Sequence, residues 1–152
     1  MHYYQRLMTP CGELTVRASD KGLTSVAFDD TSETPARPSG LTDEACSQLS
    51  DYFARRRTRF SLPLDAGGTP FQQQVWAALT TIGYGTTVSY GAVAQQLSNA
   101  NAVRAVGMAN SKNPIAIIVP CHRVIGANGT LTGYAGGLSR KAFLLRHEGV
   151  DI

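Results

Sequence analysis

The chain has 152 residues, of which 43% are hydrophobic, and a formal net charge of +3. This length can bury a core in one domain or two small ones, and the apolar fraction excludes a disordered chain. No apolar run reaches the ~20 residues of a membrane span, and residues 1–6 lack the apolar core of a signal peptide. We therefore expect a cytoplasmic protein with no membrane partner.

The charge is unevenly distributed. Met1–Asp65 holds eight basic and nine acidic side chains, whereas Ala66–Ile152 holds six basic and two acidic ones, a net charge of +4. Such a surplus attracts a polyanion weakly and also suits an ordinary solvated surface. The second part is the one expected to face a nucleic acid.

The first part predicts an antiparallel meander of three strands and then a helix. The strands are short β-branched or aromatic runs separated by turn signals, at residues 3–8, 13–19 and 23–28. Residues 29–40 predict an exposed loop, after which Thr42 is expected to cap a helix to about Arg57. The arginines at its end are more typical of a solvated helix end than of a DNA site; they are Arg55, Arg56, Arg57 and Arg59.

Cysteine usage favours free thiols. Cys11, Cys46 and Cys121 have no Cys-x-x-Cys spacing, and a structural role is expected for the first two. The first part offers only His2, Cys11 and Cys46 as His or Cys ligands, so no metal site is predicted.

The second part opens with a helix. Thr69 can cap it, Pro70 suits its first position and Gln72 completes a capping box. Trp76 falls on the apolar side with Phe71, and we expect a core residue there rather than a base-stacking platform.

Two short helical segments follow at residues 89–97 and 101–110, with the size of a helix-turn-helix, although many helix pairs look like this without binding DNA. The second segment offers small side chains, including Ala102 and Ala105, and one arginine, Arg104. It lacks the Asn, Gln and Lys array that reads bases in the major groove. Such a helix suits close, sequence-independent approach to the minor groove.

The motif Pro120-Cys121-His122-Arg123-Val124 follows an apolar run, Ile115–Val119, that predicts a buried strand. A neighbouring base and positive charge can lower a cysteine pKa from about 8.5 to about 3.5–7.5, which makes it a nucleophile. His122 and Arg123 are of the types that do this. The motif alone leaves a Cys-His hydrolase open.

This motif resembles the acceptor site of the O6-alkylguanine-DNA alkyltransferases, particularly the bacterial constitutive type. Asn113-Pro114, Gly133–Gly137 and His147–Gly149 are further family elements in family order, and the similarity is nearly continuous over residues 68–149. It implies one transfer of an alkyl group from O6-alkylguanine, or O4-alkylthymine, in double-stranded DNA to the protein's own cysteine, without a cofactor.

The resemblance assigns the chemistry to four residues. Cys121 is the acceptor, His122 is the base that relays its proton through a water, and Glu148 orients the imidazole, which repeats the logic of a hydrolase triad. Asn113 ties the turn before the acceptor strand to the helix-turn-helix.

The resemblance also assigns the DNA contacts. Arg104 fills the stack left by a flipped nucleotide, and Tyr90 crowds the neighbouring phosphate, with Ala102 and Ala105 facing the groove. From the residues alone, Arg104 could instead contact a phosphate and Tyr90 could be a packed aromatic.

The implied guanine pocket consists of Tyr134, which donates a hydrogen bond to the base, and of backbone near Val119, Cys121 and Ala135. Ala135 and Ala116 stand where animal members have serine and proline. We expect methyl and ethyl transfer and leave larger adducts open.

These observations predict an α+β fold. Residues 1–65 form a small antiparallel sheet with a helix, and residues 66–152 form a mostly helical DNA-binding domain that carries the active-site cysteine. We expect a monomer with no stable protein partner. Beside the hydrolase, the rivals are a helix-turn-helix transcription factor and an alkyltransferase-like damage-binding protein, a class that lacks the acceptor cysteine.

Overall fold

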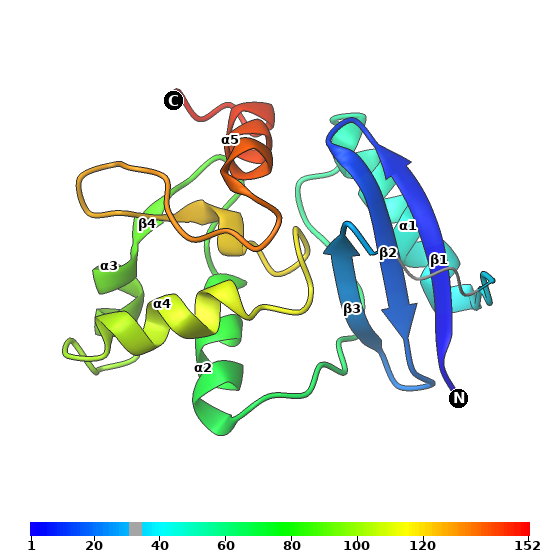
Figure 1. Ribbon diagram of the computed structural model, residues 1–152, viewed down its shortest axis with the longest axis horizontal. Helices are drawn as coiled ribbons and strands as arrows, with labels where there is room; N and C mark the ends of the chain where they lie inside the picture. The colour runs from blue at the N-terminus through cyan, green and yellow to red at the C-terminus, as the bar shows by residue number, and fades with distance from the viewer. Residues whose placement is uncertain (31–34) are drawn as a thin grey trace. The chain divides into compact units, whose positions relative to one another are not determined.

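The computed structural model describes residues 1–30 and 35–152, which form two compact units, Met1–Gly67 and Gly68–Ile152 (Figure 1). Part of the loop expected over residues 29–40 therefore lies outside the described residues. No helix in the described ranges is long and apolar enough to cross a bilayer. The mixed α+β fold agrees with the sequence prediction.

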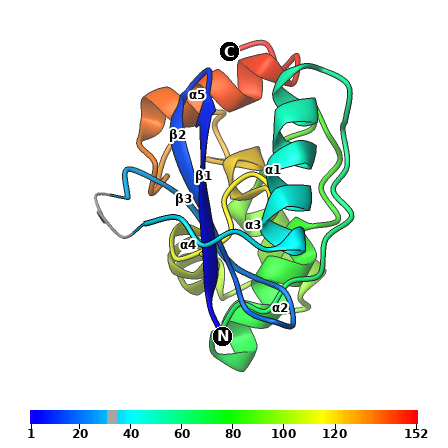
Figure 2. The ribbon, with the colours of Figure 1, turned by 90° about the vertical axis from the view of Figure 1, so that its right-hand side faces the viewer.

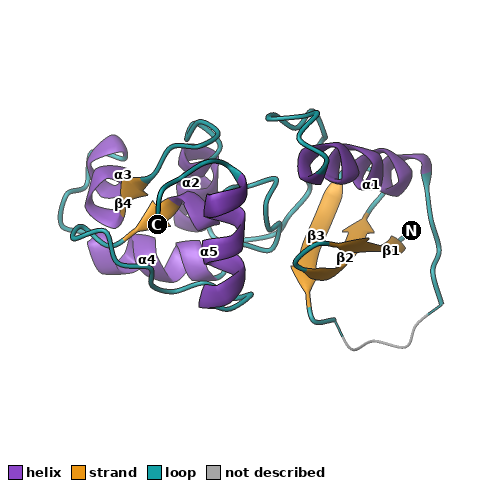
Figure 3. Cartoon of the chain, turned by 90° about the horizontal axis from the view of Figure 1, so that it is seen from above, coloured by secondary structure: helices purple, strands orange, loops and turns teal. Residues whose placement is uncertain are grey.

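The first unit is the predicted meander with one helix on it. Strands β1 (Tyr3–Thr9), β2 (Gly12–Ala18) and β3 (Leu23–Phe28) pair antiparallel in that order. Helix α1 (Gly40–Phe53) lies along one face of this sheet, as Figures 2 and 3 show. The core between helix and sheet is fully buried and includes Leu14, Val16, Ala45, Leu49 and Tyr52.

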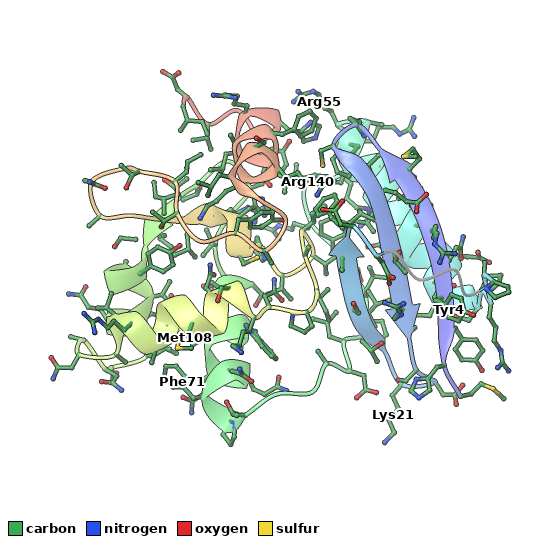
Figure 4. The ribbon with its side chains drawn as sticks, in the orientation of Figure 1. Tyr4, Lys21, Arg55, Phe71, Met108 and Arg140 are labelled. Carbon is green, nitrogen blue, oxygen red and sulfur yellow. The ribbon has the colours of Figure 1, made fainter. Side chains whose placement is uncertain are left out.

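The bounds of α1 differ from the prediction. Ser39, not Thr42, is the N-cap, because the extended Ser39 backbone lets its hydroxyl accept from the Thr42 amide while Thr42 Oγ1 accepts from the Ser39 amide. Thr42 Oγ1 also donates to Gln5 Oε1 at 2.9 Å, which fixes the helix start to β1. The helix ends at Phe53 rather than near Arg57, since Arg55, labelled in Figure 4, takes a left-handed backbone with φ of 63°.

The second unit opens with α2 (Pro70–Leu79), and its predicted capping box is confirmed. Thr69 Oγ1 accepts from the Gln72 amide at 3.1 Å, and Gln72 Oε1 accepts from the Thr69 amide at 3.0 Å. Trp76 is buried, as expected, and its Nε1 donates to the Ala109 carbonyl at 2.9 Å. This hydrogen bond joins α2 to the end of α4 (Val103–Ser111).

Helices α3 (Tyr90–Gln96) and α4 form the expected pair, and both pack on α2 (Figure 1). A short parallel pair, β4 (Val88–Ser89) with β5 (Val124–Ile125), joins the start of α3 to the chain that follows Cys121. Helix α5 (Leu138–His147) ends the unit. Along the chain, the motif Pro120–Val124 therefore lies between the helix pair and α5.

The prediction of a strand over Ile115–Val119 is wrong. The segment is a buried run of tight turns, in which the Ile118 amide donates to the Ala116 carbonyl at 2.8 Å and the Val119 amide to the Ile115 carbonyl at 3.1 Å. Ile117 has a φ of 69°, an unfavourable conformation for a β-branched residue. An apolar run reports burial, but it does not distinguish a strand from another buried conformation.

Candidate active site

Cys121 lies at the start of a single 3-10 turn, η1 (Cys121–Arg123), between Pro120 and β5. The residue is only 6% exposed, so the thiol is nearly buried. Buried backbone polar groups must find partners in such a compact segment. Two asparagines supply them.

Asn113 holds the turn segment before Cys121. Its Nδ2 donates to the carbonyls of Ile115 at 3.2 Å and Val119 at 2.9 Å, and its Oδ1 accepts from the Ile115 amide at 3.0 Å. Asn110 on α4 donates from Nδ2 to the Cys121 carbonyl at 3.4 Å. Asn110, rather than Asn113 as expected, thus provides the side-chain hydrogen bond that ties the polypeptide around the thiol to the end of α4.

His122 and Glu148 are brought together from distant positions in the chain. His122 Nε2 lies 2.7 Å from Glu148 Oε2, and both side chains are fully buried. Burial lowers the pKa of His122, although Glu148 opposes that shift. In a neutral ring Nε2 carries the hydrogen, which leaves the buried Nδ1 as an acceptor with no protein partner in the described part of the chain.

Arg123 contacts Glu148 and not the thiol. Its Nε lies 2.8 Å from Oε1 and its Nη2 lies 3.0 Å from Oε2, while Nη1 donates to the Ile82 carbonyl at 2.6 Å. The expectation that Arg123 supplies the positive charge beside Cys121 is therefore wrong. Its planar fork matches a carboxylate, so it pairs with the buried Glu148.

Lys141 supplies that charge instead. It is fully buried on α5, and its Nζ donates to the carbonyls of Val124 at 2.5 Å and Thr132 at 2.6 Å. Burial lowers the pKa of Lys141 to about 8, and the nearby Cys121 opposes the shift. A buried lysine stays charged only when carbonyls or an anion compensate it.

Burial raises the pKa of Cys121 in this structure, and the Asn113 amide and the Lys141 charge pull it down. The free thiol is therefore held mainly in its neutral form. A base is needed to remove its proton when it reacts.

Three of the residues expected at DNA lie at the start of α4. Arg104 and Ala105 are exposed on α4, with the half-buried Ala102 just before it. Within the described chain, Arg104 makes no hydrogen bond or ion pair. Met108, labelled on α4 in Figure 4, is 63% exposed one turn further along.

Tyr90 begins α3, half-buried, and its hydroxyl donates to the Thr132 carbonyl at 3.1 Å. Thr132 therefore accepts from both Tyr90 and Lys141. Tyr90, the expected phosphate contact, and Lys141, the cation beside Cys121, are therefore linked through the Thr132 carbonyl.

The residues expected to form the guanine pocket come from both sides of Cys121. Val119 is buried two residues before it, and Ala116 is half-buried in the same turn segment. Tyr134, with a buried hydroxyl, and the exposed Ala135 precede α5, whose first turn contains Arg140, labelled in Figure 4. No group of three or more His, Cys, Asp or Glu side chains that could hold a metal ion occurs among the residues described.

Comparison with known proteins identifies this arrangement. Residues 70–150 match the model of the 6-O-methylguanine DNA methyltransferase DNA binding domain, and residues 2–66 match that of its ribonuclease-like domain. The chain belongs to the 6-O-methylguanine DNA methyltransferase family. The methylated-DNA–protein-cysteine methyltransferase of Mycobacterium leprae is 50% identical, over 97% of this chain and 93% of that protein.

Solved structures of the family agree. The Mycobacterium tuberculosis O6-methylguanine methyltransferase is 48% identical with a TM-score of 0.88, over 97% of this chain and 93% of that one. A structure of that bacterium's protein in complex with DNA is 51% identical with a TM-score of 0.86, over 95% of this chain and 91% of that one. Both domains and the DNA-binding fold of the methyltransferase family are therefore present here.

The sequence singles out Cys121, His122 and Glu148, and the structure brings His122 and Glu148 together, but the sequence did not predict the partners of the two buried cations. Lys141 lies in α5 among other basic residues, and Arg123 was assigned to the thiol. A basic residue within an otherwise apolar helical face is a signal that could have pointed to Lys141. Nothing local to the sequence reveals that Arg123 pairs with Glu148, which lies 25 residues away.

Proposed function

We propose that this protein repairs DNA by direct reversal, taking the alkyl group from O6-alkylguanine, and also from O4-alkylthymine, onto Cys121 in a single turnover. The observation that carries the proposal is a nearly buried thiol grouped with a His-Glu pair and a buried lysine, behind an exposed small-residue helix. The C-terminal unit would carry both the chemistry and the DNA contact. Action as a monomer, and in the cytoplasm, stays a prediction.

The chemical step is a displacement at saturated carbon. His122 Nδ1 accepts the thiol proton, through a water that bridges it to Sγ, while Nε2 stays bonded to Glu148. The sulfur then attacks the alkyl carbon, the bond from carbon to O6 breaks, and its electron pair goes to the guanine. The guanine takes up a proton at N1 from water, and His122 returns to water the proton that it took from the thiol. The products are a thioether on Cys121 and normal guanine.

The substrate must leave the duplex first. The O6 alkyl group is shielded by stacking, so the nucleotide is rotated out at a cost of a few kcal/mol. Arg104 is exposed and has no internal partner in the described structure, which suits it to fill the space left in the stack. Tyr90 would press on the adjacent phosphate, and Ala102 and Ala105 would allow α4 to approach the minor groove.

The flipped base would lie between the two segments that flank the thiol. Tyr134 would donate to the base from one segment, and the backbone at Val119 and Ala135 would bind its edge. The small Ala116 leaves room beside the alkyl group. No cofactor is required because the acceptor is part of the chain.

The test is the intact mass of the protein after incubation with a duplex that contains one O6-methylguanine. We expect a gain of one methyl group per protein molecule, located on Cys121, and no gain with the Cys121→Ala variant or with undamaged duplex. Binding without a mass change would instead indicate a damage-binding protein. Multiple turnovers on an ester or amide would indicate a hydrolase.

A further inference from the structure

Glu148 is the most fully satisfied side chain of the site. Oε1 accepts from Arg123 Nε at 2.8 Å and from the Gly85 amide at 3.0 Å. Oε2 accepts from His122 Nε2 at 2.7 Å and from Arg123 Nη2 at 3.0 Å. Four donors therefore surround a carboxylate that has no exposed surface.

Arg123 is itself fixed from a third part of the chain. Its Nη1 binds the Ile82 carbonyl, and its guanidinium lies 5.8 Å from the centre of the Tyr84 ring. The turn after α2 thus holds the Arg123 guanidinium independently of its contacts with Glu148. The same turn supplies Gly85, whose φ is 73° and where a Cβ would lie 2.9 Å from the Glu148 carbonyl oxygen.

The buried charges around the relay form two pairs. Arg123 compensates Glu148, and Lys141 is placed to compensate the Cys121 thiolate. The charged groups that act on His122 are Glu148, Arg123 and Lys141, and the titratable Cys121 is its neighbour in the chain. A buried carboxylate with only an imidazole beside it would favour the imidazolium strongly, because an unpaired charge is costly in this environment.

We propose that Arg123 is a positioning residue that neutralises Glu148, so that Glu148 orients His122 without keeping it protonated and His122 Nδ1 stays free to accept the Cys121 proton. This inference deepens the proposed alkyl transfer and rests on it for its catalytic meaning. The charge of Arg123 opposes protonation of His122, in the same direction as burial.

The experiment is a pH titration of the histidine ring signals by NMR, on the free protein without DNA. The chain has three histidines, so replacement of His2 and His147 in turn assigns the signal of His122. Arg123→Gln removes the charge, and Arg123→Lys keeps it. We expect the His122 pKa to rise by at least about one unit in Arg123→Gln, because the opposing carboxylate is then uncompensated, and to stay near its original value in Arg123→Lys.

The acid limb of the pH profile for single-turnover methyl transfer should move to higher pH in Arg123→Gln by a similar amount. An unchanged His122 titration in a folded Arg123→Gln protein would overturn the proposal and leave Arg123 a purely structural residue. If Arg123→Gln does not fold, a rise of the His122 pKa in Arg123→Lys as large as about one unit would overturn it as well. The titration needs no DNA, so it is independent of the proposed function, whose failure would appear as wild-type protein that gains no methyl group.

Discussion

The relay around Cys121 and the exposed face of α4 differ in almost every physical respect. In the relay, His122, Glu148 and Lys141 are fully or nearly buried and their polar groups are held by short hydrogen bonds. On α4, Arg104 and Met108 are exposed, and Arg104 has no bonded partner in the described chain. The groups proposed to move protons and hold charges are thus buried, whereas the surface proposed to contact DNA is exposed and has small side chains.

The largest effect should come from the thiol itself. Cys121→Ser exchanges the sulfur for a much weaker nucleophile, so methyl transfer should fall by about 10⁴-fold or more. Affinity for duplex DNA should change little, because the proposed DNA contacts lie on α4. Single-turnover kinetics and a binding titration measure the two effects, with Cys11→Ser as the matched control. Equal losses of methyl transfer and of DNA affinity would mean that Cys121 also contributes to DNA binding.

Glu148→Gln tests how strongly the relay contributes to stability. The change leaves Arg123 buried without its counter-charge, so the free energy of unfolding should fall by about 3–5 kcal/mol. Glu13→Gln, which removes an exposed pair with Arg6, should cost about 0–1 kcal/mol. Urea unfolding of both variants gives the comparison. A similar small loss for both would show that the buried network carries little stability.

Arg104→Ala addresses the exposed face. If Arg104 replaces the flipped base in the stack, transfer from duplex DNA should fall about 10- to 100-fold, the equivalent of a few kcal/mol of unstacking. Transfer from a single-stranded oligonucleotide should fall much less, since no stack needs refilling. Lys112→Ala, at the end of the same helix, is the control for a general phosphate contact. Equal losses on both substrates, matched by Lys112→Ala, would favour the phosphate-contact alternative.

Lys141→Gln should make the thiol harder to ionise. Loss of the nearby cation should shift the pH dependence of Cys121 alkylation by iodoacetamide to higher pH by about one unit, a tenfold lower rate at neutral pH. In the wild type, the pKa of Lys141 is about 8, so its charge supports the thiolate below that pH and is lost above it. The variant should lack this change near pH 8. Superimposable profiles would show that Lys141 acts only through packing.

The smallest effect is expected at Ala135. Ala135→Ser adds one hydroxyl at the edge of the proposed guanine pocket, and a single new hydrogen bond changes rates by up to about tenfold. We expect a larger gain for benzyl than for methyl transfer, because the bulkier substrate depends more on binding. Competition between the two oligonucleotides measures the ratio. An unchanged ratio would place Ala135 outside the pocket.

Local signals in the sequence predicted the parts of the fold that depend on local physics. The capping box of Thr69 and Gln72 and the turn-punctuated strands of the meander are encoded within a few residues, and both are confirmed. The cap of α1 was misplaced because Ser39 and Thr42 are both good caps, and the contact with Gln5 that decides between them is tertiary. The turns at Ile115–Val119 look like a strand because burial imposes the same composition on both.

The candidate site shows the same division. The adjacent Cys121 and His122 could be read directly, and the family resemblance added Glu148, which lies in hydrogen-bonding contact as predicted. The environment of the thiol could not be read, since the pairing of Arg123 with Glu148 and the burial of Lys141 depend on how α5 packs against η1. A buried cation is recognised by the group of opposite charge beside it, and only folding brings the two groups together.

The most direct test of the account is a titration of the active protein against an excess of duplex that contains O6-methylguanine. Repaired guanine is measured after long incubation, when no further change occurs. If Cys121 is the final acceptor, repair stops at one guanine per protein molecule, and the same molecules then carry the methyl thioether. Repair that continues well beyond one equivalent would contradict the account, because it would require a route that frees the thiol again.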